Sequence, residues 1–276
     1  MKQDKTRKIM RYEKGSFTEK EDCVVVEQPS TIKINGKEFI TIVCSPAHME
    51  EMAIGFLVSE RIIPNYQAIQ DIRVDEKTGT VNITAEKVYP FFEQLQNKRF
   101  ISSCCGMSRQ GFVFAHDAMI AKKMTEVRVT LTPENCFQLM TDMGDTAEMF
   151  KQTGGVHNAA LCDANGIIVS RMDIGRHNAL DKIYGYCLMN HIDVRDKVIV
   201  FSGRISSEIL LKVAKIGCEI VLSKSAPTEL ALTLADDLGI TAVGFIRGSS
   251  FNLYTHPERI VSDKATAIPV KKWGDK

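Results

Sequence analysis

The chain has 276 residues, of which 44% are hydrophobic and 25% are charged, and its formal net charge is +1. These values are those of an ordinary globular protein, long enough for one large domain or two smaller ones. They exclude a global positive field that would recruit nucleic acid or an acidic membrane, and no apolar run approaches the roughly 20 residues that span a bilayer.

Eight cysteines are spread along the chain rather than crowded into a short segment, and no secretory signal precedes them. This usage is typical of proteins in a reducing compartment. We therefore expect a cytoplasmic protein whose thiols are free. No Cys-x-x-Cys pair occurs, so neither a zinc site nor an iron–sulfur cluster is expected.

The first half of the chain is predicted to be rich in β-hairpins. Residues 1–20 are polar and lack periodicity, so we expect a flexible arm there. Asn35-Gly36 separates two alternating runs and is a strong hairpin signal, because both turn positions favour positive φ. Ser45 and Pro46 resemble the cap and first turn of a helix. The other elements expected here are strands over 23–27, 69–74 and 80–85, a helix over 91–98, a helical or mixed segment over 112–123 and a strand over 127–131.

The second half predicts an alternation of strands and helices. Gly217 and Gly239 each follow a helical apolar pattern and precede an apolar run, which is typical of β-α-β crossovers in a parallel or mixed sheet. The elements expected are helices over 132–143 and 145–152, a hairpin of strands 156–162 and 166–172, helix 178–189, strand 197–201, helix 206–216, strand 218–222, helix 227–238 and strand 240–245.

These patterns predict an α/β protein in three parts. Residues 1–20 form the flexible arm, residues 21–130 form a smaller region rich in β-hairpins, and residues 131–276 form the α/β core with its mixed sheet. We find no repeat of fixed period and no low-complexity linker between the parts.

One segment of the smaller region is a candidate reactive loop. Residues 102–111 contain the adjacent thiols Cys104 and Cys105 among serines and glycines, with Arg109 and Lys98 nearby. Small residues let the backbone approach a substrate closely, and nearby cations lower the pKa of a thiol, whose thiolate is the nucleophile. The alternative, an ordinary loop with two idle thiols, is equally compatible with the composition.

The end of the last core strand is a candidate anion site. Ligands of open α/β sheets bind beyond the carboxyl ends of strands, where the guanidinium, amides and hydroxyls of residues 245–250 suit phosphate. The segment comprises Phe245, Ile246, Arg247, Gly248, Ser249 and Ser250. An ordinary surface turn has the same composition, and the sequence alone favours it. Ser202-Gly203-Arg204 also stands between a strand and a helix and is a weaker anion signal.

Two further groups of residues have side chains that could bind a ligand, transfer a proton or hold a metal. Asp173, Arg176 and His177 suit binding or proton transfer; alternatively His177 or Asn178 caps a helix and Asp173 pairs with Arg176. His48-Met49-Glu50 matches the His-x-Glu of zinc deaminases, but the second half of that motif is missing. We therefore expect no metal site.

Taken together, the motifs resemble the formate dehydrogenase accessory sulfurtransferase family, FdhD. The matching pieces run through most of the chain in the family's order. They are residues 51–60, Ser103-Cys104, 155–160, 173–182, 202–204, 224–228, 244–247 and 252–257.

The resemblance implies a fold and a function. It implies a cytidine-deaminase-like α/β/α core without the deaminase zinc, in a cytoplasmic protein that forms a homodimer. Such proteins accept persulfide sulfur from a cysteine desulfurase and pass it to the molybdenum bis-guanine-dinucleotide cofactor of formate dehydrogenase. The persulfide cysteine falls on Cys104, and the segment that binds the guanine nucleotide falls on residues 245–250.

The sequence departs from the family in one place. Many members carry Cys-x-x-Cys in the reactive loop, but here Met107 stands three residues after Cys104. Either Cys104 works alone or Cys105 takes the helper role. The rival functions are a cofactor-binding chaperone without covalent sulfur transfer and, with a different chemistry, a nucleotide deaminase.

Overall fold

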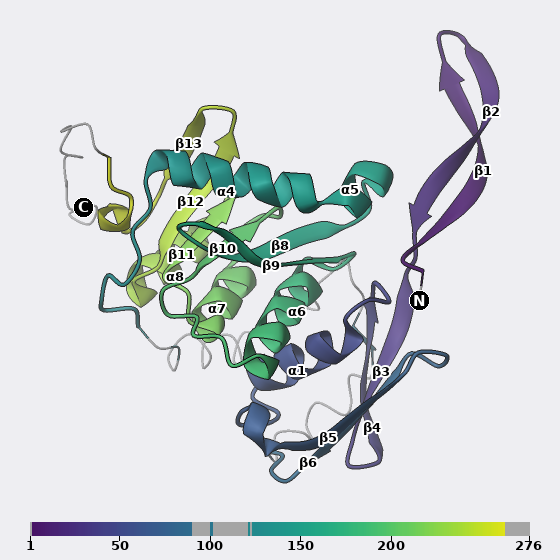
Figure 1. Cartoon of the computed structure of the whole chain (residues 1–276), viewed down its shortest axis with the longest axis horizontal. Helices are drawn as coiled ribbons and strands as arrows, with labels where there is room; N and C mark the ends of the chain where they lie inside the picture. The colour runs from purple at the N-terminus through teal and green to yellow at the C-terminus, as the bar shows by residue number, and fades with distance from the viewer. Residues whose placement is uncertain (1, 90–99, 102–120, 122, 263–276) are drawn as a thin grey trace.

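The computed structural model describes residues 2–89, 100–101, 121 and 123–262. Its largest sheet has six strands in the order β13-β12-β11-β10-β8-β9 (Figure 1). The strands are β8 (His157–Asp163), β9 (Gly166–Asp173), β10 (Val198–Phe201), β11 (Ile220–Ser223), β12 (Thr241–Arg247) and β13 (Ser250–Leu253).

The centre of this sheet is built from two crossovers. Strands β10, β11 and β12 are parallel, and α7 (Ser207–Ile216) and α8 (Glu229–Leu238) connect them. Gly217 and Gly239 end these helices in the left-handed conformation, as the sequence predicts. The other pairs are antiparallel, so the sheet is mixed and the predicted β-α-β units are confirmed.

Helices cover both faces of the sheet. Alternate strand residues such as Leu161 and Phe201 pack with α6 (Arg176–Met189), α7 and α8, whereas Cys162 and Val200 pack with α4 (Pro133–Thr146). The expected α/β/α arrangement is therefore present in this half of the chain (Figure 1). Helix α5 (Glu148–Thr153) continues beyond α4.

A second sheet has five strands in the order β5-β6-β3-β4-β7. They are β3 (Gln28–Ile34), β4 (Lys37–Cys44), β5 (Ile69–Asp75), β6 (Thr80–Ala85) and β7 (Phe100–Ile101). Asn35 and Gly36 adopt positive φ in the turn between β3 and β4, which confirms the predicted hairpin. A short 3-10 helix, η1 (Tyr66–Ala68), precedes β5, and a second, η2 (Pro257–Arg259), follows β13.

The two sheets are joined by a close helix crossing. Helix α1 (Met49–Ser59) lies against α6, and the contact centres on two glycines. A Cβ on Gly55 would overlap the carbonyl of Asp181, and one on Gly185 would overlap the carbonyl of Glu51. The backbones can approach this closely only because neither position has a side chain.

The N-terminal segment differs from its prediction. Residues expected to be a flexible arm form a two-stranded hairpin of β1 (Asp4–Glu13) and β2 (Ser16–Val25). Asp4 pairs with Val25 at its base, and Glu13 pairs with Ser16 at its tip. The purple ribbon projects from the body in Figure 1. Both of its faces meet solvent, so charged residues occupy both and the usual apolar alternation is absent.

Two other predictions in the first half are wrong. Helix α1 begins at Met49 rather than at Pro46, because the Ser45 hydroxyl accepts a hydrogen bond from Ile174 N (3.1 Å) instead of capping a helix. Residues 127–131 contribute only a bridge from Leu131 to Ile260. The predicted helix over 91–98 lies outside the described residues, and so does the predicted segment over 112–123 except for residues 121 and 123. No helix in the part that the model describes has the length and apolarity needed to cross a membrane.

Candidate anion-binding site

A cavity of about 480 Å³ lies at the carboxyl edge of β10, β11 and β12. This is the edge at which open α/β sheets bind ligands, and the volume is in the usual range for small-molecule sites. The lining comes from the start of β8, the start of α6 and the ends of three strands: His157, Arg176, Ser202, Gly203, Arg204, Ser206, Ser225, Ala226, Phe245 and Arg247.

Hydrogen bonds of the backbone and of two serine hydroxyls hold the loops of the cavity together. Ser202 N donates to the carbonyl of Asn158 (3.0 Å), and Asn158 N donates to the Ser202 hydroxyl (2.9 Å). The Ser225 hydroxyl donates to the carbonyl of Ser202 (3.0 Å), which ties the loop after β11 to the loop after β10. The cavity is therefore pre-formed.

Helix N-termini face the same edge. Strand β9 runs parallel to β10, because each is antiparallel to β8, so α6, α7 and α8 all begin at this edge. Arg176 is the first residue of α6, and Ser206 caps α7 by accepting from Ile209 N. Free amides and the helix dipole give these ends a partial positive charge.

Three arginines supply full positive charge. Arg176, Arg204 and Arg247 line the cavity, and no carboxylate is among the described lining residues. Arg247 Nε donates to the carbonyl of Lys224 (3.4 Å), and its guanidinium lies 5.6 Å from the centre of the Phe245 ring. Guanidinium groups bind phosphate through paired hydrogen bonds. The cavity is therefore suited to a phosphate-bearing ligand.

Only part of the predicted segment 245–250 reaches this cavity. Phe245 and Arg247 line it, whereas Ile246 is buried in the core. Gly248 and Ser249 form the turn to β13, which begins at exposed Ser250. The hydroxyls in the cavity belong instead to residues 202 and 206, in the loop after β10, and to residue 225, in the loop after β11.

The loop 173–178 is divided between the cavity and the core. Asp173 does not pair with Arg176; its carboxylate lies 2.6 Å from Lys182 Nζ, and both side chains are fully buried. The N-cap of α6 is Gly175, so neither His177 nor Asn178 caps the helix. His177 Nε2 lies 3.1 Å from a carboxylate oxygen of Glu208. The alternative of helix capping and an Asp173–Arg176 pair is therefore wrong, and Arg176 is the residue of this loop that lines the cavity.

The described thiols are poor nucleophiles. Burial raises the pKa of Cys44, Cys136, Cys162 and Cys187 to about 12. The pKa of fully buried Cys218 is raised well above its ordinary value for the same reason. A hydrogen bond to Asp4 raises the pKa of Cys23 on the hairpin. Cys104 and Cys105 lie outside the described residues.

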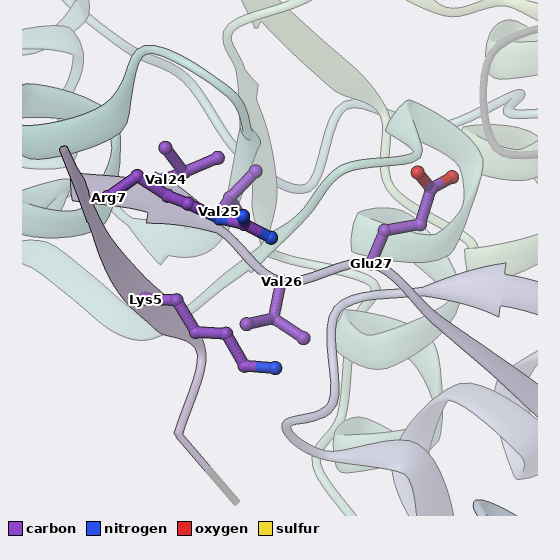
Figure 2. Close-up of a pocket in the computed structure, with 6 residues that line it drawn as sticks. All are labelled: Lys5, Arg7, Val24, Val25, Val26 and Glu27. Atoms are coloured by element: carbon purple, nitrogen blue, oxygen red, sulfur yellow. The ribbon is translucent and has the colours of Figure 1, made fainter. Parts of the chain in front are cut away.

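A second, smaller hollow of about 190 Å³ lies at the base of the hairpin. Figure 2 shows Lys5 and Arg7 of β1 beside Val24, Val25 and Val26, with Glu27 at the far side. It has less positive charge than the cavity and includes a carboxylate. Within the described residues, no group of three or more His, Cys, Asp or Glu is arranged to hold a metal ion.

The fold and the cavity define a mixed α/β protein with a candidate anion-binding site at the carboxyl edge of its main sheet. The family comparison goes further. The chain belongs to the FdhD/NarQ family, whose model matches residues 25–261. The resemblance seen in the sequence is thereby confirmed.

Relatives match along nearly the whole chain. The sulfur carrier protein FdhD of Shouchella clausii is 54% identical over 258 residues, which are 92% of this chain and 96% of that protein. The protein of the same name from Bacillus subtilis is 52% identical over 254 residues, which are 92% of this chain and 96% of that protein. A crystal structure described as a formate dehydrogenase accessory protein from Desulfotalea psychrophila has a TM-score of 0.77 and covers 94% of this chain and 100% of its own. At 24% identity it supports the fold alone.

Proposed function

We propose that this chain is a sulfur carrier that accepts a persulfide sulfur on Cys104 and delivers it to the molybdenum bis-guanine-dinucleotide cofactor destined for formate dehydrogenase. The relatives named sulfur carrier protein FdhD support the general role, since more than half of their aligned residues are identical to those of this chain. The observation that carries the cofactor part is the cavity, which gathers three arginines and two helix N-termini.

The first chemical step is an exchange between two sulfur centres. The Cys104 thiolate attacks the outer sulfur of the persulfide on a cysteine desulfurase. A new S–S bond forms on Cys104, the S–S bond of the donor breaks, and the donor cysteine leaves as a thiolate. The reaction needs an accessible thiol of low pKa. The six described cysteines do not meet this requirement, which leaves Cys104 and Cys105 as the candidates.

The acceptor is a substrate rather than a resident cofactor. Each guanine dinucleotide part carries a diphosphate, which suits Arg176, Arg204 and Arg247 together with the serine hydroxyls. Soft sulfur ligands bind readily to molybdenum, so the metal is a reasonable destination for the carried sulfur. The proposal places the protein in the cytoplasm with its desulfurase, and a homodimer remains a prediction.

Substitution of the two cysteines tests the proposal. In cells without their own copy of the gene, we expect C104A to abolish formate dehydrogenase activity while the purified variant still binds the cofactor. C105A shows whether the neighbouring thiol is needed. C162A is the matched control, since Cys162 is buried in the core and should leave activity intact. Full activity of C104A would instead support a chaperone that binds the cofactor without carrying sulfur.

A further inference from the structure

One lining residue of the anion cavity differs from the rest in its acid–base chemistry. Among the described lining residues, His157 alone has a side chain that ordinarily gains or loses a proton near neutral pH. The arginines stay charged and the serines stay neutral. A change in the charge of the cavity near neutral pH therefore depends on this imidazole.

Hydrogen bonds hold the backbone next to His157 in place. His157 is the first residue of β8. The adjacent Asn158 donates a hydrogen bond from its backbone N to the Ser202 hydroxyl and accepts one from Ser202 N at its carbonyl. A Cβ on Gly203 would lie 3.4 Å from His157 Nδ1, so the ring sits directly against that glycine. The residue is thus placed at the wall of the cavity, with its ring beside Gly203.

The groups that face His157 favour its neutral form when the cavity holds no anion. Burial lowers the pKa of His157, and Arg176 of α6 lowers it further. Asp173 of β9 raises it and His177 of α6 lowers it, both more weakly. Arg204 and Arg247 line the same cavity from the loops after β10 and β12. At neutral pH the imidazole therefore adds no charge to the unliganded cavity.

We propose that the cavity is a proton-linked anion site, in which His157 takes up a proton from solvent when a diphosphate binds and then donates a hydrogen bond to it. The inference rests on the proposed function, since it concerns the same cavity. An anion within hydrogen-bond distance favours the charged form of a histidine, whereas the empty cavity disfavours it. Between the two resulting pKa values, binding consumes one proton, so affinity rises as pH falls.

The linkage can be measured with a ligand whose own charge does not change. P1,P2-di(guanosine) diphosphate has two diester phosphates, and its phosphate charge is constant from about pH 5 to 8, where histidine titrates. With the full chain, we expect its association constant to rise by up to roughly tenfold for each unit that the pH falls through the window. Calorimetry in two buffers of different ionisation enthalpy should count up to one proton taken up.

The variants separate His157 from the rest of the protein. H157N cannot take up the proton, so we expect it to bind with little pH dependence. H191N is the control, because His191 is exposed and lies outside the cavity. If H157N does not fold, the pH titration of the His157 ring signal by NMR, with and without ligand, measures the same shift in the parent chain.

The outcomes divide clearly. Proton uptake in the parent and in H191N, together with its loss in H157N, supports the inference. Binding without proton uptake in the parent, or uptake that persists in H157N, overturns it and leaves the anion site intact. Failure of the parent to bind the probe at any pH overturns the anion site as well.

Discussion

Replacement of Lys182 by methionine should be one of the most destabilising substitutions in the chain. Lys182 Nζ lies 2.6 Å from the Asp173 carboxylate and donates to the carbonyls of Ser45 (3.3 Å) and Met172 (3.2 Å). Removal of one member of a buried ion pair typically costs about 3–5 kcal/mol, because the other charge is left without a partner. A loss of this size lowers the unfolding midpoint by roughly 6–20 °C, at about 2–4 °C per kcal/mol.

Two features of the site refine this magnitude. Methionine has nearly the volume of lysine, so little of the loss comes from a cavity. The Asp173 carboxylate also keeps three donors, Ser45 N (3.0 Å), Gly175 N (2.8 Å) and Asn178 Nδ2 (2.9 Å), which limits the loss. The double variant D173N/K182M leaves no orphan charge and should recover part of the stability, because the amide at residue 173 keeps one acceptor oxygen for the donors that face it.

Urea and thermal unfolding of the purified variants provide the assay. K8M is the matched control, since Lys8 and Glu19 form an ion pair (3.1 Å) in which the side chains are 76% and 62% exposed. Exposed pairs contribute about 0–1 kcal/mol, so K8M should unfold almost as the parent does. Equal stability of K182M and K8M would refute the reasoning.

Three further outcomes are expected. G185A should destabilise the chain by about 1–3 kcal/mol or more in urea unfolding, because its methyl group meets the α1 backbone. The control G144A, which has open space around it in α4, should be neutral or stabilising, and equal stability of the two variants would contradict the close crossing of α1 and α6. Iodoacetamide at pH 7.5 should leave the five buried cysteines unlabelled until the chain unfolds, as peptide mapping would show; their rapid labelling would contradict their burial. R204Q should weaken binding of P1,P2-di(guanosine) diphosphate by roughly 10- to 150-fold, which corresponds to about 1.5–3 kcal/mol for a lost charged hydrogen bond. The control R195Q, on the surface beside Asp193, should bind as the parent does, and equal losses in the two variants would argue against a local site.

Local signals predicted most of the regular elements. Asn35-Gly36 predicts the β3–β4 turn because its positive φ values depend on two adjacent residues. Thr132 predicts the start of α4, where it forms a capping box with Asn135. Such features are decided within a few residues of the chain, so the sequence contains them directly.

The errors arose where distant contacts decide the outcome. Ser45 has the chemistry of a helix cap, but its hydroxyl is used by Ile174, more than a hundred residues away. The hairpin of β1 and β2 lacks apolar alternation because neither face is covered, so the usual strand signal is missing.

The candidate site was predicted only in part for the same reason. Arg247 was found because it follows an apolar strand, and Arg204 gave a weaker signal of the same kind. The serines of the cavity come from two loops, one after β10 and one after β11, which meet because these strands are neighbours in the sheet. Local sequence cannot show which loops will meet at a sheet edge, so residues 249 and 250 were named, residue 202 gave only the weaker signal, and residues 206 and 225 were missed.

The central claim is that Cys104 carries the sulfur, and peptide mass spectrometry tests it most directly. The full chain is incubated with a cysteine desulfurase and cysteine, alkylated and digested, and each cysteine-containing peptide is examined for added sulfur. The account predicts one additional sulfur atom on the peptide at residue 104, absent from C104A. No added sulfur there, or sulfur confined to other cysteines, would contradict it.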